Sequence, residues 1–169
     1  GFKLLLDIIL SSKKTIKYSE IPFEFKKRHS GESKLNSRVL VDFISLLIDK
    51  IIGKFIPARY FIYSFIGCIG IIFQLTNFYF LQFFLNFNLA LILSILFTIF
   101  FNFVLNNEFT YSDLKKRGYR FLIGLLKYYF FCSFGALFNF ISARLIYDNT
   151  SNIYFAVLIG AFVGSIWNY

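Results

Sequence analysis

The succession of polar and apolar positions divides the chain into a mixed first third and a strongly apolar remainder. Residues 60–107 form a run of 48 positions without a charged side chain. A single helix of that length would measure about 72 Å, more than twice the hydrocarbon core of a bilayer, which is about 30 Å thick. The run must therefore fold back, and Asn86 and Asn88 are predicted to form the turn between spans 60–82 and 89–107.

Two further apolar runs follow this pair. Residues 121–143 contain one charged side chain, Lys127, which lies close enough to the end of the run to extend its amine toward the interface. Residues 153–169 form the last run. The pattern predicts an integral membrane protein, mostly α-helical, with four transmembrane helices.

Short internal similarities indicate a duplication among these helices. Residues 70–74 (GIIFQ) resemble residues 135–139 (GALFN), and residues 101–103 (FNF) resemble residues 167–169 (WNY), at offsets of 65 and 66 positions. Two matches at nearly one offset predict two repeated hairpins, with parallel copies related by an axis along the membrane normal. Chance similarity in a sequence of few residue types is the alternative.

A narrow polar stripe marks the segment before the first span. Arg38, Asp42, Ser45 and Asp49 recur at steps of four, three and four, and Val, Leu, Ile and Phe fill most positions between them. This spacing predicts an amphipathic helix within residues 36–57, lying in the membrane interface. A helix packed in the core of a globular domain is the alternative.

The first 35 residues have a mixed pattern. Residues 2–10 show helical periodicity, and Ile21, Phe23 and Phe25 alternate around Pro22 as in an edge strand. One helix and one strand cannot form a domain, so we interpret this segment as the end of a larger α/β unit.

Composition and charge support the membrane assignment. The chain is 57% hydrophobic and 16% charged, whereas soluble proteins have about 25% charged residues. Of the 18 Lys and Arg residues, 12 precede Tyr60 and four lie within residues 115–120, so most of the positive charge lies next to the predicted spans. This distribution explains the net charge of +9 and argues against a nucleic-acid partner. The loops around Asn86 and Asp148 offer only Arg144, which predicts that both termini face the cytoplasm.

Polar side chains inside the predicted spans are costly in lipid unless they are paired. We expect them to form interhelical hydrogen bonds, with a path for a lipid phosphate as the alternative. The spacing of Gly160 and Gly164 permits two helices to approach closely. The amide residues concerned are Gln74, Asn77, Asn102, Asn139 and Asn168.

The stretch 25–35 (FKKRHSGESKL) has the chemistry of a phosphate-binding loop. Arg28 offers a planar fork of donors, Lys34 a point charge and Ser33 a neutral donor. Gly31 lets backbone amides approach an anion. Because the stretch lies next to the predicted interfacial helix, it is placed to reach the headgroup of an anionic lipid. A solvated basic loop without a ligand is the alternative.

Four segments together resemble one kind of protein. They are the opening GFKLLLDII, the stretch EIPFEFKKRHSGESKL with its R-x-x-G-x-S-K pattern, the interfacial helix, and the span end NFVLNNEFTY. The chain is similar to the C-terminal part of a polyprenyl-phosphate glycosyltransferase, a family 2 glycosyltransferase of the dolichol-phosphate mannose synthase kind, followed by a GtrA-like transmembrane domain. Asn107 stands where the GtrA-like pattern often has a basic residue.

The resemblance implies three parts and an activity. Residues 1–35 would end a GT-A type α/β catalytic domain, residues 36–57 would be the interfacial helix, and residues 58–169 would be the four-helix transmembrane domain. The implied reaction transfers mannose or glucose from GDP-mannose or UDP-glucose to dolichyl or undecaprenyl phosphate, at the cytoplasmic face of the cell membrane.

The resemblance also implies where the chemistry lies. Arg28, Gly31, Ser33 and Lys34 would bind the lipid phosphate or the donor diphosphate. The catalytic residues and the ligands of Mg²⁺ or Mn²⁺ are expected upstream of Gly1, in a longer protein of which these residues are a part. The 169 residues alone are therefore not expected to catalyse the reaction. Two other functions stay open: translocation of a polyprenyl-phosphate-linked sugar without its synthesis, and passive anchoring. A homo-oligomer also stays open.

Overall fold

The computed structural model describes residues 8–9, 11–12, 17, 19, 21–22, 37–51 and 57–168. The chain forms two compact units, Gly1–Phe61 and Ile62–Tyr169. The described residues form helices and turns, without a strand. Each unit is presented by itself.

The first unit contains α2 (Ser37–Ile51), which confirms a helix within the segment 36–57. Leu40 and Ile44 on this helix are about half exposed, as an apolar face without a protein cover would be. Ile21 and Pro22 are irregular, and most of the strand and the first helix predicted in residues 1–35 lies outside the described residues. The glycosyltransferase end and the interfacial position of α2 therefore stay predictions.

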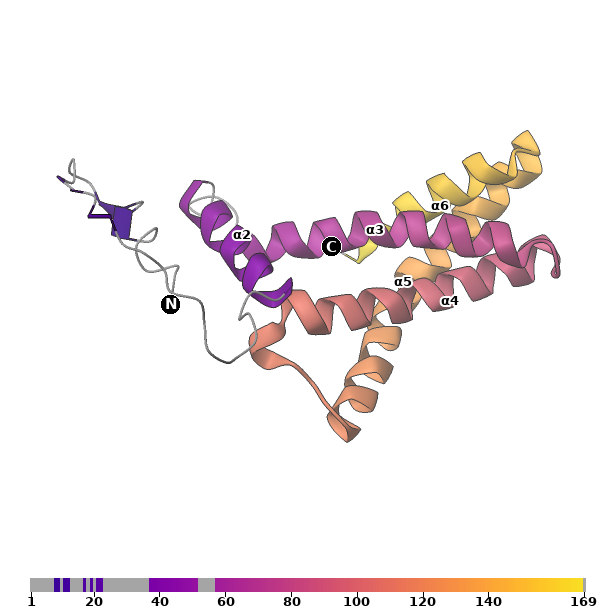
Figure 1. The fold of residues 1–169 in the computed structure, drawn as a ribbon. Helices are drawn as coiled ribbons and strands as arrows, with labels where there is room; N and C mark the ends of the chain where they lie inside the picture. The colour runs from indigo at the N-terminus through magenta and orange to yellow at the C-terminus, as the bar shows by residue number, and fades with distance from the viewer. Residues whose placement is uncertain are drawn as a thin grey trace. The chain divides into compact units, whose positions relative to one another are not determined.

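The second unit is a set of apolar helices, drawn from magenta to yellow in Figure 1. They are α3, α4, α5 and α6, with a π-helical turn η1 and a 3₁₀ turn η2 between α4 and α5. Their bounds are α3 Ala58–Leu81, α4 Phe87–Leu105, η1 Asn106–Thr110, η2 Ser112–Leu114, α5 Tyr119–Thr150 and α6 Ile153–Trp167.

Asparagine caps start two of these helices. The side-chain oxygen of Asn86 accepts a hydrogen bond from the Leu89 amide at 3.0 Å, and that of Asn152 accepts from the Phe155 amide at 3.1 Å. Each cap satisfies one of the amides that a helix start leaves without an intrahelical partner. The turn predicted at Asn86 is thereby confirmed.

Helix α5 contains the third predicted span, residues 121–143, and continues beyond it. It extends to Thr150, and Arg144 and Asp148, one helical turn apart, form an ion pair at 3.0 Å on the surface of this last part. The helix ends at Ser151, whose φ of 53° is left-handed. The polar residues that suggested a loop therefore belong to the last two turns of the helix.

Three helices are long and apolar enough to cross a bilayer: Ala58–Leu81, Phe87–Thr110 and Tyr119–Thr150. Helix α6 is apolar but has 15 residues, so it measures about 22 Å, less than the hydrocarbon core. The structure thus shows three candidate spans and one shorter apolar helix, in place of the four full spans predicted.

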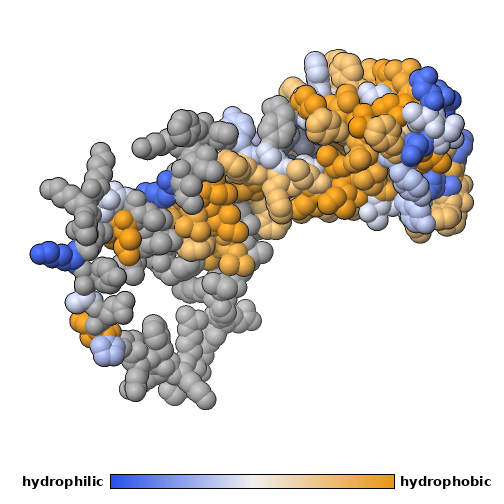
Figure 2. All heavy atoms as spheres, turned by 90° about the horizontal axis from the view of Figure 1, so that it is seen from above, coloured by the Kyte–Doolittle hydropathy of each residue, from blue (hydrophilic) through white to orange (hydrophobic). Residues whose placement is uncertain are grey.

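Many large apolar side chains face outward in this unit, and the buried positions hold small and polar side chains beside an apolar cluster that includes Phe78 and Leu91. Figure 2 shows a broad hydrophobic surface, with hydrophilic residues gathered at one end. Such a surface suits lipid, where helices associate through van der Waals packing, close approach at small residues and interhelical hydrogen bonds. Exposed examples are Phe65, Phe80, Leu126 and Phe130; buried examples are Ala90, Ser94, Ala143 and Ala156.

Helices α5 and α6 pack most closely, at the predicted glycine pair. A Cβ atom added to Gly164 would lie 2.7 Å from the carbonyl oxygen of Gly135, and one added to Gly160 would lie 2.6 Å from that of Asn139. Both distances are shorter than van der Waals contact, so only glycine permits this approach. The prediction made from Gly160 and Gly164 is confirmed.

Candidate functional site: a polar cavity among the helices

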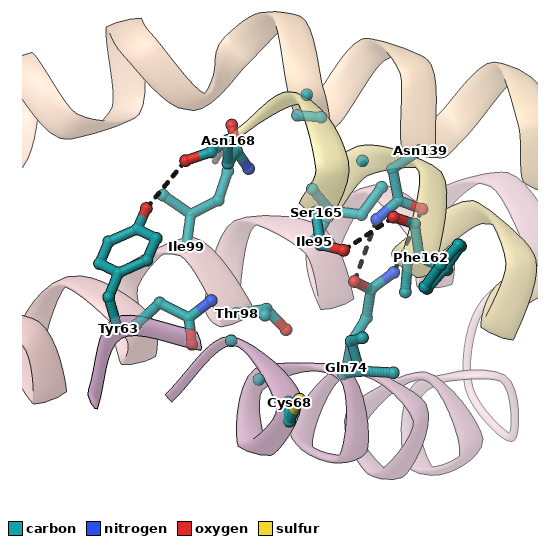
Figure 3. A pocket seen from close by; sticks show the side chains of 18 of the residues that line it. Tyr63, Cys68, Gln74, Ile95, Thr98, Ile99, Asn139, Phe162, Ser165 and Asn168 are labelled. Carbon is teal, nitrogen blue, oxygen red and sulfur yellow. Dashed lines mark hydrogen bonds between the residues drawn. The ribbon is translucent and has the colours of Figure 1, made fainter. Parts of the chain in front are cut away.

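The helices of the second unit enclose a cavity of about 200 Å³, which we call the central cavity. Carboxamides, hydroxyls and small residues from α3, α4, α5 and α6 line it, and none of the lining residues is Asp, Glu, Lys, Arg or His. Figure 3 shows it from close by. Its polar side chains include Tyr63, Gln74, Thr98, Asn102, Asn139 and Asn168.

One reciprocal amide pair joins α3 to α5 in this cavity. The Asn139 Nδ2 donates to Gln74 Oε1 at 3.0 Å, and the Gln74 Nε2 donates to Asn139 Oδ1 at 3.4 Å. Both side chains are buried. Pairing satisfies the two amides where lipid offers them no partner, so this contact is the interhelical bond that the sequence predicts for Gln74 and Asn139.

Asn102 on α4 presents an unsatisfied acceptor. Its Oδ1 is buried and has no hydrogen-bond partner. The carboxamide lies against Gly70 of α3, where an added Cβ would come within 2.5 Å of Oδ1. A buried carbonyl oxygen without a donor costs about 1–3 kcal/mol, so this atom is a ready acceptor for a hydroxyl or water in the cavity.

Two hydroxyl groups of the cavity have partners within the protein. The Tyr63 hydroxyl donates to the backbone oxygen of Asn168 at 3.0 Å, and the Thr98 hydroxyl donates to the Ser94 carbonyl at 2.8 Å. Asn77 lies outside the cavity and bonds the Phe73 carbonyl of its own helix at 2.8 Å, so the interhelical bond predicted for Asn77 is absent.

Residues 62–169 match the family model described as GtrA/DPMS, transmembrane domain. The chain belongs to the GtrA/DPMS transmembrane domain family. A search of curated proteins and a search of solved structures each find no match. The GtrA-like part of the resemblance is thereby confirmed, and the match begins after the segment interpreted as the end of a catalytic domain.

The phosphate-binding residues predicted for this GtrA/DPMS protein are Arg28, Gly31, Ser33 and Lys34, and all four lie outside the described residues. The part of the chain that the structure describes contains no cluster of three His, Cys, Asp or Glu side chains suited to a metal ion. The site that the structure does provide is therefore the neutral cavity of the GtrA/DPMS domain.

The sequence predicts interhelical hydrogen bonds for the amides of this domain, with a lipid-phosphate path as the alternative, but we did not predict a role for the hydroxyl groups beside them. The missed signal lies on α3, where Tyr63, Gly67, Gly70 and Gln74 follow one another at steps of four, three and four. That spacing puts them on one helix face. All four line the cavity.

Proposed function

We propose that this chain is the membrane part of a glycosyltransferase that transfers mannose or glucose from a nucleotide sugar to polyprenyl phosphate. The observation that carries the proposal is the match of residues 62–169 to the GtrA/DPMS transmembrane domain. The loop sequence 25–35, in which Arg28 and Lys34 stand on either side of a glycine and a serine, supports it from the other part of the chain.

In the proposed reaction, Arg28 and Lys34 bind phosphate oxygens, and Ser33 donates a further hydrogen bond. An oxygen of the lipid phosphate attacks the anomeric carbon of the sugar. The bond between that carbon and the nucleotide diphosphate breaks, and its electron pair leaves with the diphosphate. A divalent cation, Mg²⁺ or Mn²⁺, would stabilise the charge on the leaving diphosphate. Its ligands are proposed to lie outside these 169 residues.

The proposed orientation places both termini and the loop 111–118 in the cytoplasm of a multi-pass cell-membrane protein. Lys115, Lys116 and Arg117 make this loop basic. At the opposite end, Arg144 is paired with Asp148 and also donates to Asn88 at 3.1 Å, so its charge is balanced locally. An excess of Lys and Arg in the cytoplasmic loops is the usual arrangement.

A second candidate function is translocation of a polyprenyl-phosphate-linked sugar without its synthesis. The central cavity favours it because carboxamides and hydroxyls bond the hydroxyl groups of a sugar and impose no charge on it. The free acceptor on Asn102 is the atom best placed for such a bond.

Mass spectrometry of lipids from membranes that express the whole protein separates these functions. With nucleotide sugar supplied to the cytoplasmic face, we expect new polyprenyl-phosphate sugar, and Arg28→Ala should lower its rate at least about tenfold, or about 1.4 kcal/mol of barrier. Lys26→Ala, a matched loss of charge outside the motif, should change the rate less than about twofold. If no lipid-linked sugar forms but a supplied one crosses the membrane, translocation replaces synthesis.

A further inference from the structure

A second cavity, of about 390 Å³, lies where α4 passes through η1 into the loop before α5. We call it the basic cavity. Its wall includes Lys116 and Lys127, both exposed, together with Phe103, Leu114 and Phe131. None of its lining residues carries a carboxylate.

Asn107 fixes the loop that supplies one of these lysines. Its Oδ1 accepts from the Lys116 amide at 2.8 Å, and its Nδ2 donates to the Lys116 carbonyl at 3.2 Å. Asn107 is buried in the π-helical turn η1. Such turns are rare in proteins as a whole, but those that occur are often found at functional sites. The Asn107 carboxamide thus fixes the backbone of Lys116 against η1, at the end of α4.

Lys116 and Lys127 both line the basic cavity, on the side formed by the start of α5. The Lys116 side chain lies over Gly124, with Nζ 3.2 Å from where a Cβ atom would be. Lys127 is three residues further along α5, and therefore on the same helix face. Lys115, the sequence neighbour, instead forms an ion pair with Glu108, and neither of those two lines the cavity.

The walls of the cavity have two kinds of surface. The wall carries two cations and no carboxylate, so it attracts an anion, and a phosphate group has enough oxygens to accept from two ammonium groups. Leu114 and Phe131, which are 66% and 71% exposed, extend the wall with apolar surface that suits a hydrocarbon chain. A free inorganic ion would use only the first of these features.

We propose that the basic cavity binds the phosphate of an isoprenoid lipid, with Lys116 and Lys127 as its cationic ligands and Asn107 as the positioning residue. This inference rests on the proposed function and names a lipid-phosphate site in the membrane domain, separate from the loop 25–35. The lipid chain leaves the cavity along Leu114 and Phe131.

Binding of undecaprenyl phosphate to the chain in phosphatidylcholine nanodiscs tests the proposal, with native mass spectrometry as the readout. Lys116→Gln combined with Lys127→Gln should weaken binding at least about tenfold, about 1.4 kcal/mol. Arginine at both positions should retain binding, and Lys115→Gln, the matched control, should change it less than about twofold. Circular dichroism of each variant verifies that the helices are intact.

Three competitors identify the ligand. Uncharged undecaprenol, 10 mM inorganic phosphate and nanodiscs containing phosphatidylglycerol should each fail to displace undecaprenyl phosphate. Equal binding of undecaprenol would show that the lysines do not contribute to binding. Displacement by inorganic phosphate would show that the hydrocarbon chain of the lipid does not contribute. Displacement by phosphatidylglycerol would show a general attraction to anionic lipid. Each of these results overturns the proposal.

Product formation by the whole protein is scored separately. Lysine-dependent lipid binding without any lipid-linked sugar product would overturn the proposed function alone. Product formation, together with undecaprenyl phosphate binding that is unchanged when both lysines are replaced, would overturn this inference alone.

Discussion

The reciprocal pair between Gln74 and Asn139 provides a measurable test of how the membrane unit is held together. Replacing Gln74 by Leu keeps a similar volume and removes both hydrogen bonds, of 3.0 and 3.4 Å. Hydrogen bonds between transmembrane helices average about 0.6 kcal/mol and reach about 1.7. Because the replacement also leaves the buried Asn139 amide unpaired, we expect a loss of about 1–2 kcal/mol in the free energy of unfolding.

The double variant separates the pair from its surroundings. If the loss comes from the mutual bonds, Gln74→Leu with Asn139→Leu should cost no more than either single change, because no amide is left unpaired. The interaction energy should then be about 1 kcal/mol or more. Unfolding by sodium dodecyl sulfate in mixed micelles, followed by circular dichroism, gives the three free energies.

A matched control is available on the same helix. Asn77→Leu removes an amide that bonds only its own helix, to the Phe73 carbonyl, so it should cost less than about 0.5 kcal/mol. The reasoning would be refuted if the losses of the two single variants, Gln74→Leu and Asn139→Leu, added up to the loss of the double variant within about 0.4 kcal/mol, because independent sites are additive in that way.

Three further predictions concern the helix contacts and the topology. Gly164→Ala should destabilise the unit by about 1–3 kcal/mol in the same assay, because its new Cβ would meet the Gly135 carbonyl oxygen at 2.7 Å. Gly67→Ala is the control and should be neutral or stabilising, because nothing lies within 4 Å of its new Cβ. Equal losses for the two variants would contradict this. Ser151→Gly should raise the free energy of unfolding by about 1 kcal/mol because it relieves a left-handed φ of 53°, and an unchanged value would show that the serine is not strained. A cysteine at Lys116, with the two native cysteines replaced by alanine, should react with an impermeant maleimide only from the cytoplasmic side; labelling from outside would overturn the proposed orientation.

The positions of the helices follow from sequence wherever one local signal dominates. The uncharged run 60–107 and the capping Asn86 predict α3, its turn and α4 within two residues at each helix start. The extension of α5 beyond residue 143 was not predicted, because Arg144 and Asp148 indicate a loop when each is considered alone, whereas their spacing permits an ion pair on a helix surface.

The sites are less predictable because they depend on contacts between distant residues. Sequence identified Gln74 and Asn139 as costly amides, but their pairing joins positions 65 residues apart. The basic cavity requires the bond from Asn107 to the backbone of Lys116, and nothing in the pattern of charges distinguishes Lys116 from Lys115. The ion pair of Lys115 with Glu108 makes that distinction in space.

The contacts of the second unit bear on the predicted duplication of its helices. Gly70 packs against the carboxamide of Asn102, and Gly135 packs against that of Asn168, which are the residues of the two sequence matches. In a duplicated pair of hairpins, Gln74 and Asn139 would be equivalent, and their bond to each other would place both beside the axis relating the copies.

The same comparison accounts for the central cavity. With the offset of 66 positions, Gly160 and Gly164 of α6 correspond to Ser94 and Thr98 of α4. The glycines let α6 approach α5, whereas α4 carries the larger serine and threonine at the corresponding positions. Thr98 lines the central cavity together with Asn102. A duplication that kept the asparagine and lost the small residues in one copy would therefore produce a polar cavity beside a tightly packed helix pair.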